Sequence, residues 1–373
     1  MKKLLPVIIP LLTTIILLIV FSILKTNPVI AEWWTMHISN GYYFVINWLT
    51  KYIPFSLTEV FFVSLFVFIV ILIIKLIKDF IKKDWIGGVK KIGIIATSVL
   101  SVICVYSLCC EMAYNRKPID LPFYQEEVEN SEFKNIYNYY ANDLNECVNQ
   151  FEFTDEGDLK HDYSYVKISK KVHESFDKNI DSDYYYKVET NAKPMLSSFI
   201  YRELNITGVT FAPFVEANVD YLSTNLELPL VIAHEIAHTK GVMREDDANQ
   251  FAFYLCLNSD DPYLRLSAYG LYFYQLTLLT GDDYMSTEDQ NSLVDVDVNY
   301  YRARRYMINY WKKHQLLKDT GQAVNNAYIN SSGVPEGTDS YQGGTEVTTD
   351  PVTMKLVPSQ YQSLFFTSYY QNK

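Results

Sequence analysis

Three long runs of apolar residues dominate the first third of the chain. They cover Leu4–Leu24, Phe55–Ile74 and Ile92–Cys110. A helix needs about 20 apolar residues to cross the hydrocarbon core of a bilayer. The pattern therefore predicts three transmembrane helices in a membrane region, with the lipid bilayer as a partner of the chain. Because the first run is too long for the apolar part of a signal peptide, we expect it to stay uncleaved, although Val29-Ile30-Ala31 weakly matches a cleavage motif.

Lysine residues predict how the chain is oriented in the membrane. The loop after the second apolar run holds six lysines between positions 75 and 91, whereas the loop after the first run has only Lys25 and Lys51. Short loops rich in Lys and Arg face the cytoplasm. The chain is therefore predicted to be a multi-pass cell-membrane protein with residues 111–373 outside the cytoplasm, and Trp33 and Trp34 suit the outer interface.

Charge separates the membrane region from the rest of the chain. The first 110 residues contain ten Lys and four acidic residues, a net charge of +6, while the whole chain carries −11. The remaining residues therefore carry −17. An acidic domain argues against nucleic acid as a partner, because such binding needs a basic surface.

Periodicity in the second part predicts a mostly helical α+β domain. We expect a linker over residues 111–130, the domain itself over 131–345, and a tail over 346–373 that is disordered in part. Gly208–Phe214 has strand character, and its Pro213 suits an edge position. Residues 152–190 show no clear pattern. Helices are predicted at Ser131–Phe151, Ala192–Leu204, Leu228–Lys240, Glu245–Leu257, Tyr263–Leu279 and Thr287–Lys313.

The sequence His234-Glu235-Ile236-Ala237-His238 carries the clearest chemistry. Residues four apart share one face of a helix, so both imidazoles can bind one metal ion. This pattern is typical of zinc peptidases, in which the glutamate is the general base that takes a proton from a zinc-activated water. The alternative is a surface helix with two unrelated histidines. Apolar neighbours on both sides disfavour it, since two buried imidazoles without a metal would need other partners.

A catalytic zinc needs a third protein ligand. Glu245 follows His238 by seven residues, beyond a turn at Gly241, and is the predicted third ligand. Asn249 lies one helical turn further and is predicted to accept a hydrogen bond from a ligand imidazole. The alternative is that Glu245 only stabilises a helix N-terminus.

The other histidines and the cysteines have weaker claims. We expect His161, His173 and His314 to be solvated, because their segments are charged or rich in tyrosine. Cys147 and Cys256 can form a disulfide outside the cell, but two unpaired thiols in the core are the favoured interpretation.

Three blocks of the chain resemble a known family. They are Gly208–Asp220, Ala233–Cys256 and, more weakly, Gly333–Tyr341. The chain is similar to an uncharacterised family of bacterial multi-span membrane proteins with a zincin-like domain, placed with the gluzincin-type metallopeptidases. The resemblance covers roughly Met112–Tyr341, in patches.

The resemblance bears on the roles of three residues. Tyr341 matches a Ser-Tyr pair that recurs near the end of the family's domain, which implies that it donates a hydrogen bond to the oxyanion. The alternative is that Tyr341 is a packing residue in a loose tail. Glu245 and Asn249 match the third-ligand motif of gluzincins, many of which have Asp at the last position. Asn249 therefore puts a strong carboxylate–histidine pair in doubt here.

These observations together predict a membrane-anchored zinc metallopeptidase that hydrolyses extracytoplasmic peptide or protein substrates. One alternative is an intramembrane protease, but the run Leu226–Ala237 is too short to span a bilayer. The other is a zinc-binding sensor or scaffold without catalysis, against which the intact Glu235 speaks.

Overall fold

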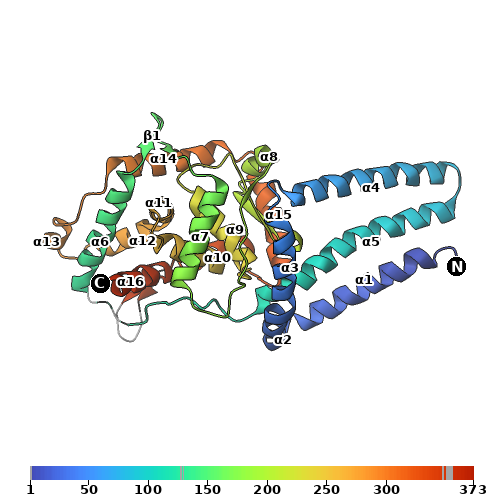
Figure 1. The fold of residues 1–373 in the computed structure, drawn as a ribbon, viewed down its shortest axis with the longest axis horizontal. Coiled ribbons are helices and arrows are strands. Elements are labelled where there is room, and N and C mark those ends of the chain that lie inside the picture. Colours follow the sequence, from blue (N-terminus) through green and yellow to red (C-terminus); the bar gives the residue numbers. More distant parts are fainter. Residues whose placement is uncertain (1, 127, 129, 347, 350–355) are drawn as a thin grey trace.

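The computed structural model describes residues 2–126, 128, 130–346, 348–349 and 356–373. The described chain is mainly helical. Three helices are long and apolar enough to cross a membrane, namely α1 (Leu5–Leu24), α4 (Leu57–Ile81) and α5 (Trp85–Cys109). They lie side by side and project from one end of a larger helical domain (Figure 1).

The second and third spans extend further into the Lys-rich loop than the apolar runs predicted. Ser56 caps α4 by accepting a hydrogen bond from the Glu59 amide, and α4 continues past Ile74 to Ile81. Asp84 caps α5 by accepting from the Gly87 amide, so α5 begins at Trp85. Helix continues here because lysines are good helix formers and need not be apolar once the chain has left the hydrocarbon.

A helical segment joins the first span to the second. It consists of α2 (Pro28–Trp34), the π-helical turn η1 (Thr35–Ser39) and α3 (Asn40–Thr50). In Figure 1 this segment runs across the ends of the three spans, between them and the larger domain. The segment and residues 111–373 therefore lie at the same end of the three candidate spans.

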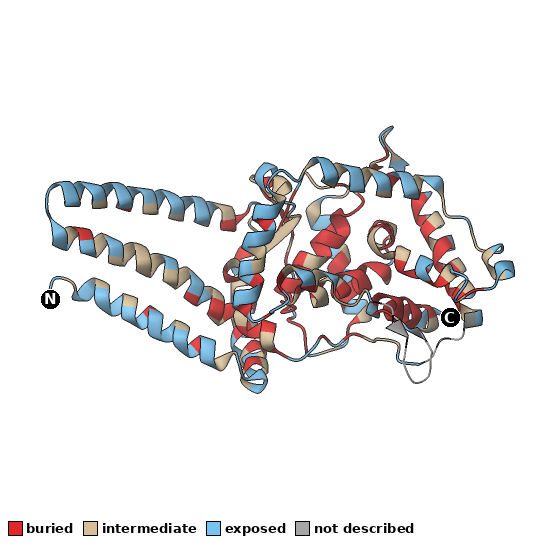
Figure 2. Ribbon diagram, turned by 180° about the vertical axis from the view of Figure 1, so that it is seen from behind, coloured by how far each residue is buried: buried red, intermediate tan, exposed pale blue. Residues whose placement is uncertain are grey.

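The larger domain has one extended core that joins most of its helices. Buried positions concentrate in its central helices, while the three spans consist mainly of exposed and intermediate residues (Figure 2). Its helices are α6 (Asn130–Val148), α7 (Tyr165–Asn179), α8 (Ser198–Glu203), α9 (Leu228–Thr239), α10 (Glu245–Leu257), α11 (Pro262–Tyr272), α12 (Tyr274–Thr277), α13 (Thr287–Gln290), α14 (Val298–Lys313), α15 (Lys318–Ser332) and α16 (Gln360–Asn372). Short 3-10 turns occur at η2 (Glu111–Asn115), η3 (Ala212–Phe214), η4 (Leu278–Thr280) and η5 (Gly337–Gln342).

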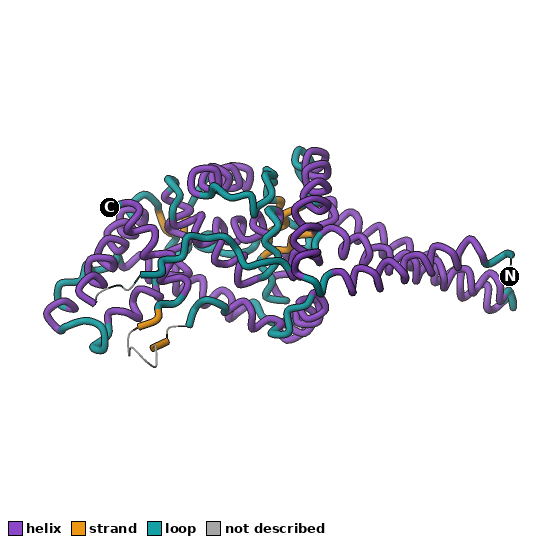
Figure 3. Tube along the Cα trace, turned by 90° about the horizontal axis from the view of Figure 1, so that it is seen from below, coloured by secondary structure: helices purple, strands orange, loops and turns teal. Residues whose placement is uncertain are grey.

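Strands are few and short among the described residues (Figure 3). The main sheet has the order β3-β5-β4, with β3 parallel and β4 antiparallel to the central strand. The predicted edge position of the Gly208 segment is thus confirmed, although the strand ends at Phe211 and η3 follows. The strands are β1 (Glu152–Phe153), β2 (Leu159–Lys160), β3 (Lys193–Pro194), β4 (Gly208–Phe211), β5 (Glu216–Val219), β6 (Thr348–Thr349) and β7 (Leu356–Val357).

The structure corrects three of the predicted helices. The expected helix Tyr263–Leu279 is divided at Phe273 into α11 and α12, which the 3-10 turn η4 follows. The expected helix Ala192–Leu204 is the strand β3 followed by the shorter α8. The expected helix Thr287–Lys313 is divided into α13 and α14, because Asp297 starts a new helix by capping the Asn299 amide.

Parts of the predicted linker and tail pack against the rest of the described chain. Met112, Ala113 and Tyr114 are buried directly after α5, and Arg116 binds Glu32 across the domain boundary. At the other end, residues 360–372 form α16, which is packed into the core through its aromatic side chains. Residues 347 and 350–355 of the predicted tail lie outside the described chain.

Candidate metal centre

Helix α9 carries the histidine motif and is held at both ends. Glu227 precedes it and accepts hydrogen bonds from the Trp311 indole (2.8 Å) and the Thr224 amide (2.9 Å). Pro229 occupies the first turn, where a missing amide hydrogen costs nothing. Gly241 follows the end of α9 and has a φ of +86. A Cβ at that position would lie 2.8 Å from the Tyr186 ring. The predicted turn at Gly241 is confirmed.

The turn after α9 folds the chain back on itself. The Val242 amide donates to the Ala237 carbonyl, as in a helix C-cap. Helix α10 then begins at Glu245, as predicted, and packs along α9. The first residue of α10 is thereby brought to the face of α9 that bears both histidines.

Three side chains converge at this point. The Nε2 atoms of His234 and His238 lie 3.1 Å apart. Glu245 Oε2 is 3.2 Å from Nε2 of His234 and 3.5 Å from Nε2 of His238. All three residues thus offer one ligand atom each to a common centre.

Hydrogen bonding indicates which nitrogen of His238 is free. Its Nδ1 lies 2.7 Å from the Val242 carbonyl oxygen, which can only accept. The Nδ1 atom therefore carries the hydrogen, and neutral His238 directs the lone pair of Nε2 at the Glu245 carboxylate. Two acceptors that face each other in a buried site need a cation between them, either a proton or a metal ion. The donor set of two imidazoles and one carboxylate suits zinc.

The pKa values of Glu245 and His238 reflect the attraction between the carboxylate and the imidazoles. Burial would raise the pKa of Glu245, but the facing imidazoles of His238 and His234 outweigh it and bring the pKa well below its usual range. Burial would lower the pKa of His238, yet the Glu245 carboxylate raises it to about 9. Without a metal, the cluster is therefore held together by a proton on His238, and a metal ion would displace that proton.

The carboxylate of Glu235 lies against the sheet. The Thr210 hydroxyl of β4 donates to its Oε2 (2.7 Å) and to its main-chain carbonyl (2.9 Å). Gly208, at the start of β4, has no side chain to obstruct the carboxylate. Burial raises the pKa of Glu235, which moves the carboxylate toward the range useful for a general base.

Tyr341 lies in η5, beside the start of α10. Asn325 of α15 donates to its phenol oxygen (3.0 Å). Burial raises the pKa of Tyr341 well above its usual value, and the nearby Glu245 carboxylate adds to the increase. The phenol therefore stays protonated and is available as a neutral donor next to the ligand cluster.

Asn249 has a different partner from the one predicted. Its side-chain amide donates to the main-chain carbonyl of Tyr341 (3.1 Å). Among the described residues its hydrogen bonds do not include either imidazole, and the Val242 carbonyl takes the partner position on His238 instead. Asn249 thus anchors the segment that carries Tyr341.

Sequence reasoning did not identify four residues of the site. Thr210 and Val242 act through hydrogen bonds that depend on the fold, and Val242 acts through its main chain. Tyr114 is buried, whereas Tyr328 is 36 % exposed and its phenol oxygen accepts a hydrogen bond from Tyr114 (3.1 Å). Desolvation of the phenol raises the pKa of both residues, and the Glu245 carboxylate adds to the increase. The chain has 31 tyrosines, so composition could not have distinguished these two.

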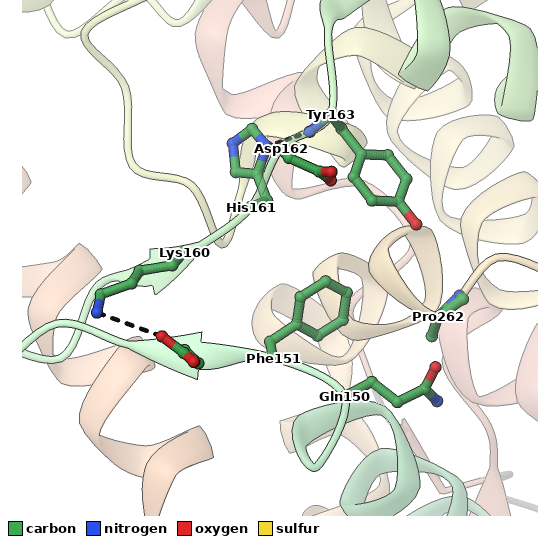
Figure 4. Close-up of a pocket in the computed structure, with 8 residues that line it drawn as sticks. Gln150, Phe151, Lys160, His161, Asp162, Tyr163 and Pro262 are labelled. Carbon is green, nitrogen blue, oxygen red and sulfur yellow. Dashed lines mark hydrogen bonds and ion pairs between the residues drawn. The ribbon is translucent and has the colours of Figure 1, made fainter.

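The remaining histidines lie outside the cluster. His161 lines a pocket of about 410 Å³ between the β1–β2 ribbon and the start of α11, together with Phe151 and Tyr163 (Figure 4). His314 pairs with Glu203 at 3.0 Å. His173 is buried, contrary to expectation, because α7 turns this face toward the core, where Nε2 donates to the Thr190 carbonyl.

Both cysteines of the larger domain, Cys147 and Cys256, are buried free thiols, as the sequence favoured.

Comparison with known proteins adds one match. The profile of a family described as "protein of unknown function (DUF3810)" matches residues 37–347. No curated protein and no solved structure matches the chain.

Proposed function

Because the chain belongs to the DUF3810 family, whose description assigns no function, we propose from its own geometry that it is a membrane-anchored zinc metallopeptidase. The larger domain would then be a zincin-like domain of the gluzincin type. One observation carries the proposal, namely the convergence of His234, His238 and Glu245 on one centre beside a buried glutamate.

The ligand assignment rests on the donor atoms. His234 and His238 would bind through Nε2, and Glu245 through a carboxylate oxygen. When bound, zinc supplies a Lewis acid that polarises a carbonyl and makes water acidic enough to deprotonate near neutral pH. The Val242 carbonyl keeps His238 in the tautomer that this binding requires.

The chain's own residues would move the proton. Glu235 accepts a proton from water and passes it to the leaving amine, which is the role of a general base followed by a general acid. Thr210 donates to one oxygen of this carboxylate and fixes its orientation. Tyr341 would donate a hydrogen bond to the oxyanion that develops on the substrate carbonyl.

The substrate would be a peptide or protein outside the cytoplasm. The lysines at positions 75–91, at the end of the spans opposite the larger domain, support this orientation. Protease added to intact cells or protoplasts should then cut residues 111–373, and cleavage only after lysis would reverse the orientation.

Peptide digestion tests the proposed activity. The full chain, purified in detergent and loaded with zinc, is incubated with a library of unstructured peptides, and new termini are counted by mass spectrometry. We expect Glu235→Gln to abolish cleavage while it retains zinc, and His161→Ala to serve as an active control. A wild-type chain that binds zinc without cutting any peptide would favour the sensor or scaffold instead.

A further inference from the structure

Helix α3 has one face on the larger domain and one exposed apolar face. On the inner face, the Tyr42 hydroxyl donates to the Pro213 carbonyl (2.7 Å) and the Thr50 hydroxyl to the Phe214 carbonyl (3.0 Å). The outer face and the turn after it carry five large side chains whose exposed fraction is 54–76 %, namely Phe44, Val45, Trp48, Leu49 and Tyr52. Such a surface is costly in water unless something covers it.

The neighbouring spans indicate what covers this face. The segment α2–α3 begins four residues after α1 ends, and α4 begins seven residues after α3 ends. Both ends of the segment are therefore tied to the membrane boundary, and the segment runs across the ends of the spans (Figure 1). A helix with Trp and Phe on one face and polar contacts on the other suits the headgroup region of a bilayer.

A second exposed apolar surface lies beside the start of α4. Around helix α8, the side chains of Leu196, Phe199 and Ile200 are exposed by 81, 59 and 45 %. Glu59, in the first turn of α4, accepts hydrogen bonds from the Leu196 amide (2.9 Å) and the Ser197 amide (2.8 Å). This surface is therefore held near the membrane boundary as well.

A buried carboxylate joins the sheet to the same span. Glu216 of β5 is fully buried, pairs with Lys193 of β3 (2.5 Å), and accepts hydrogen bonds from the Leu57 and Thr58 amides. Its carboxylate thus caps the N-terminus of α4, where a negative charge is favourable. Because a buried carboxylate is costly to strip of its hydrogen-bond donors, the sheet and the start of α4 are held together as one unit.

This unit sets the height of the candidate metal centre above the membrane. The Thr210 hydroxyl of β4 binds Glu235, and Phe211, the next residue, packs against Phe62 and Phe61 of α4 with ring centroids 5.0 and 6.1 Å away. Strand β4 rises about 3.4 Å per residue, so Gly208 and Phe211 are about 10 Å apart. The carboxylate of Glu235 therefore lies about the length of one short strand away from the first apolar turns of α4.

We infer that α3 and α8 seat the larger domain in the bilayer surface, and that the candidate site acts on the membrane-proximal segment of a membrane-anchored polypeptide. The second half of this inference rests on the proposed peptidase function. An extended chain covers about 3.4 Å per residue, so a segment of about three to six residues reaches from the membrane boundary to a site at this height. Anchoring also raises the effective concentration of substrate at the site.

Spin labels test the seating of the domain. The full chain is reconstituted in vesicles of phosphatidylethanolamine and phosphatidylglycerol, with single cysteines at Phe44, Leu49 or Phe199. The control is Val298→Cys on α14, which is as exposed as Phe44 (both 66 %). All five native cysteines are buried, and the parent chain measures background labelling.

We expect labels at Phe44, Leu49 and Phe199 to collide more with oxygen than with a water-soluble nickel complex, and the Val298 label to do the opposite. Labels at Leu49 and Phe199 that behave like the Val298 label would overturn the seating.

Two forms of one probe test the substrate class. A degenerate 20-residue peptide is offered either free or fused to a transmembrane helix in the same vesicles, with Glu235→Gln as the negative control. We expect the anchored form to be cut faster than the free form, with its cuts within about six residues of the membrane. Equal cutting of the free peptide, or cuts spread along the anchored one, would contradict the proposed substrate class. If the wild type cuts neither form, the peptidase proposal fails too, whereas the spin labels still decide the seating.

Discussion

Gly208 lies directly against the carboxylate of Glu235. A Cβ built on Gly208 would be 2.3 Å from Oε1 and 2.7 Å from the carboxyl carbon. The backbone of Gly208 is that of an ordinary strand, and its φ is not positive. The requirement for glycine here is therefore one of space, and it connects an edge strand to the proposed general base.

Gly208→Ala should displace the Glu235 carboxylate. We expect kcat/KM for peptide cleavage to fall by about 10²-fold, since a shift of about 1 Å in a reacting group has that effect. Zinc content should not change, because Gly208 is not against the ligands. Gly281→Ala is the matched control, as a Cβ there meets nothing within 4 Å. Full activity of Gly208→Ala would show that Glu235 either tolerates the shift or is not the base.

Tyr341→Phe tests the proposed oxyanion donor. Removing the phenol oxygen should lower kcat by about 10²-fold or more, with KM and zinc content little changed. The control is Tyr361→Phe, a buried tyrosine whose hydroxyl contacts Tyr272 in the core. Unchanged kcat in Tyr341→Phe would assign Tyr341 to packing alone.

His173 should make the fold sensitive to acid. Burial, with a contribution from the Lys240 cation, lowers the pKa of His173 to about 3, against about 6.5 in an unfolded chain. Between these values the unfolded chain binds more protons, so stability falls as the pH drops below about 6.5.

The slope of that loss should be at most about 1.4 kcal/mol per pH unit from this residue. His173→Gln, which can still donate to the Thr190 carbonyl, should flatten the fall of Tm between pH 6.5 and 4.5. His37→Gln, an exposed residue whose ring contacts its own helix, should leave the slope as it is. An identical slope in His173→Gln and the parent chain would contradict the assignment.

Local sequence signals explain why α9 and α10, the helices of the candidate metal centre, were predictable. Pro229 and Gly241 mark the ends of α9, and the acidic residues at 245–247 mark the start of α10. Each signal acts within a few residues of the boundary that it sets. The three ligand candidates could therefore be named from spacing alone, and the structure brings them together.

Long-range packing explains what was not predictable. Helix α16 follows a stretch rich in Gly and Thr and is ordered by contacts with α6, α10 and α12. His173 lies between charged neighbours in sequence, yet Val172 and Phe176 turn its helix toward the core. The partner on His238 is a main-chain carbonyl, which no side-chain pattern can reveal.

The metal content of the purified full chain tests the central claim most directly. We predict about one equivalent of zinc in the wild type and in Glu235→Gln, and loss of zinc in His238→Ala and in Glu245→Ala, with His161→Ala as the control that retains it. The affinity should increase with pH up to about 9, because zinc must displace the proton on His238. Zinc retained by His238→Ala and Glu245→Ala, or no zinc bound by a folded wild type, would contradict the account.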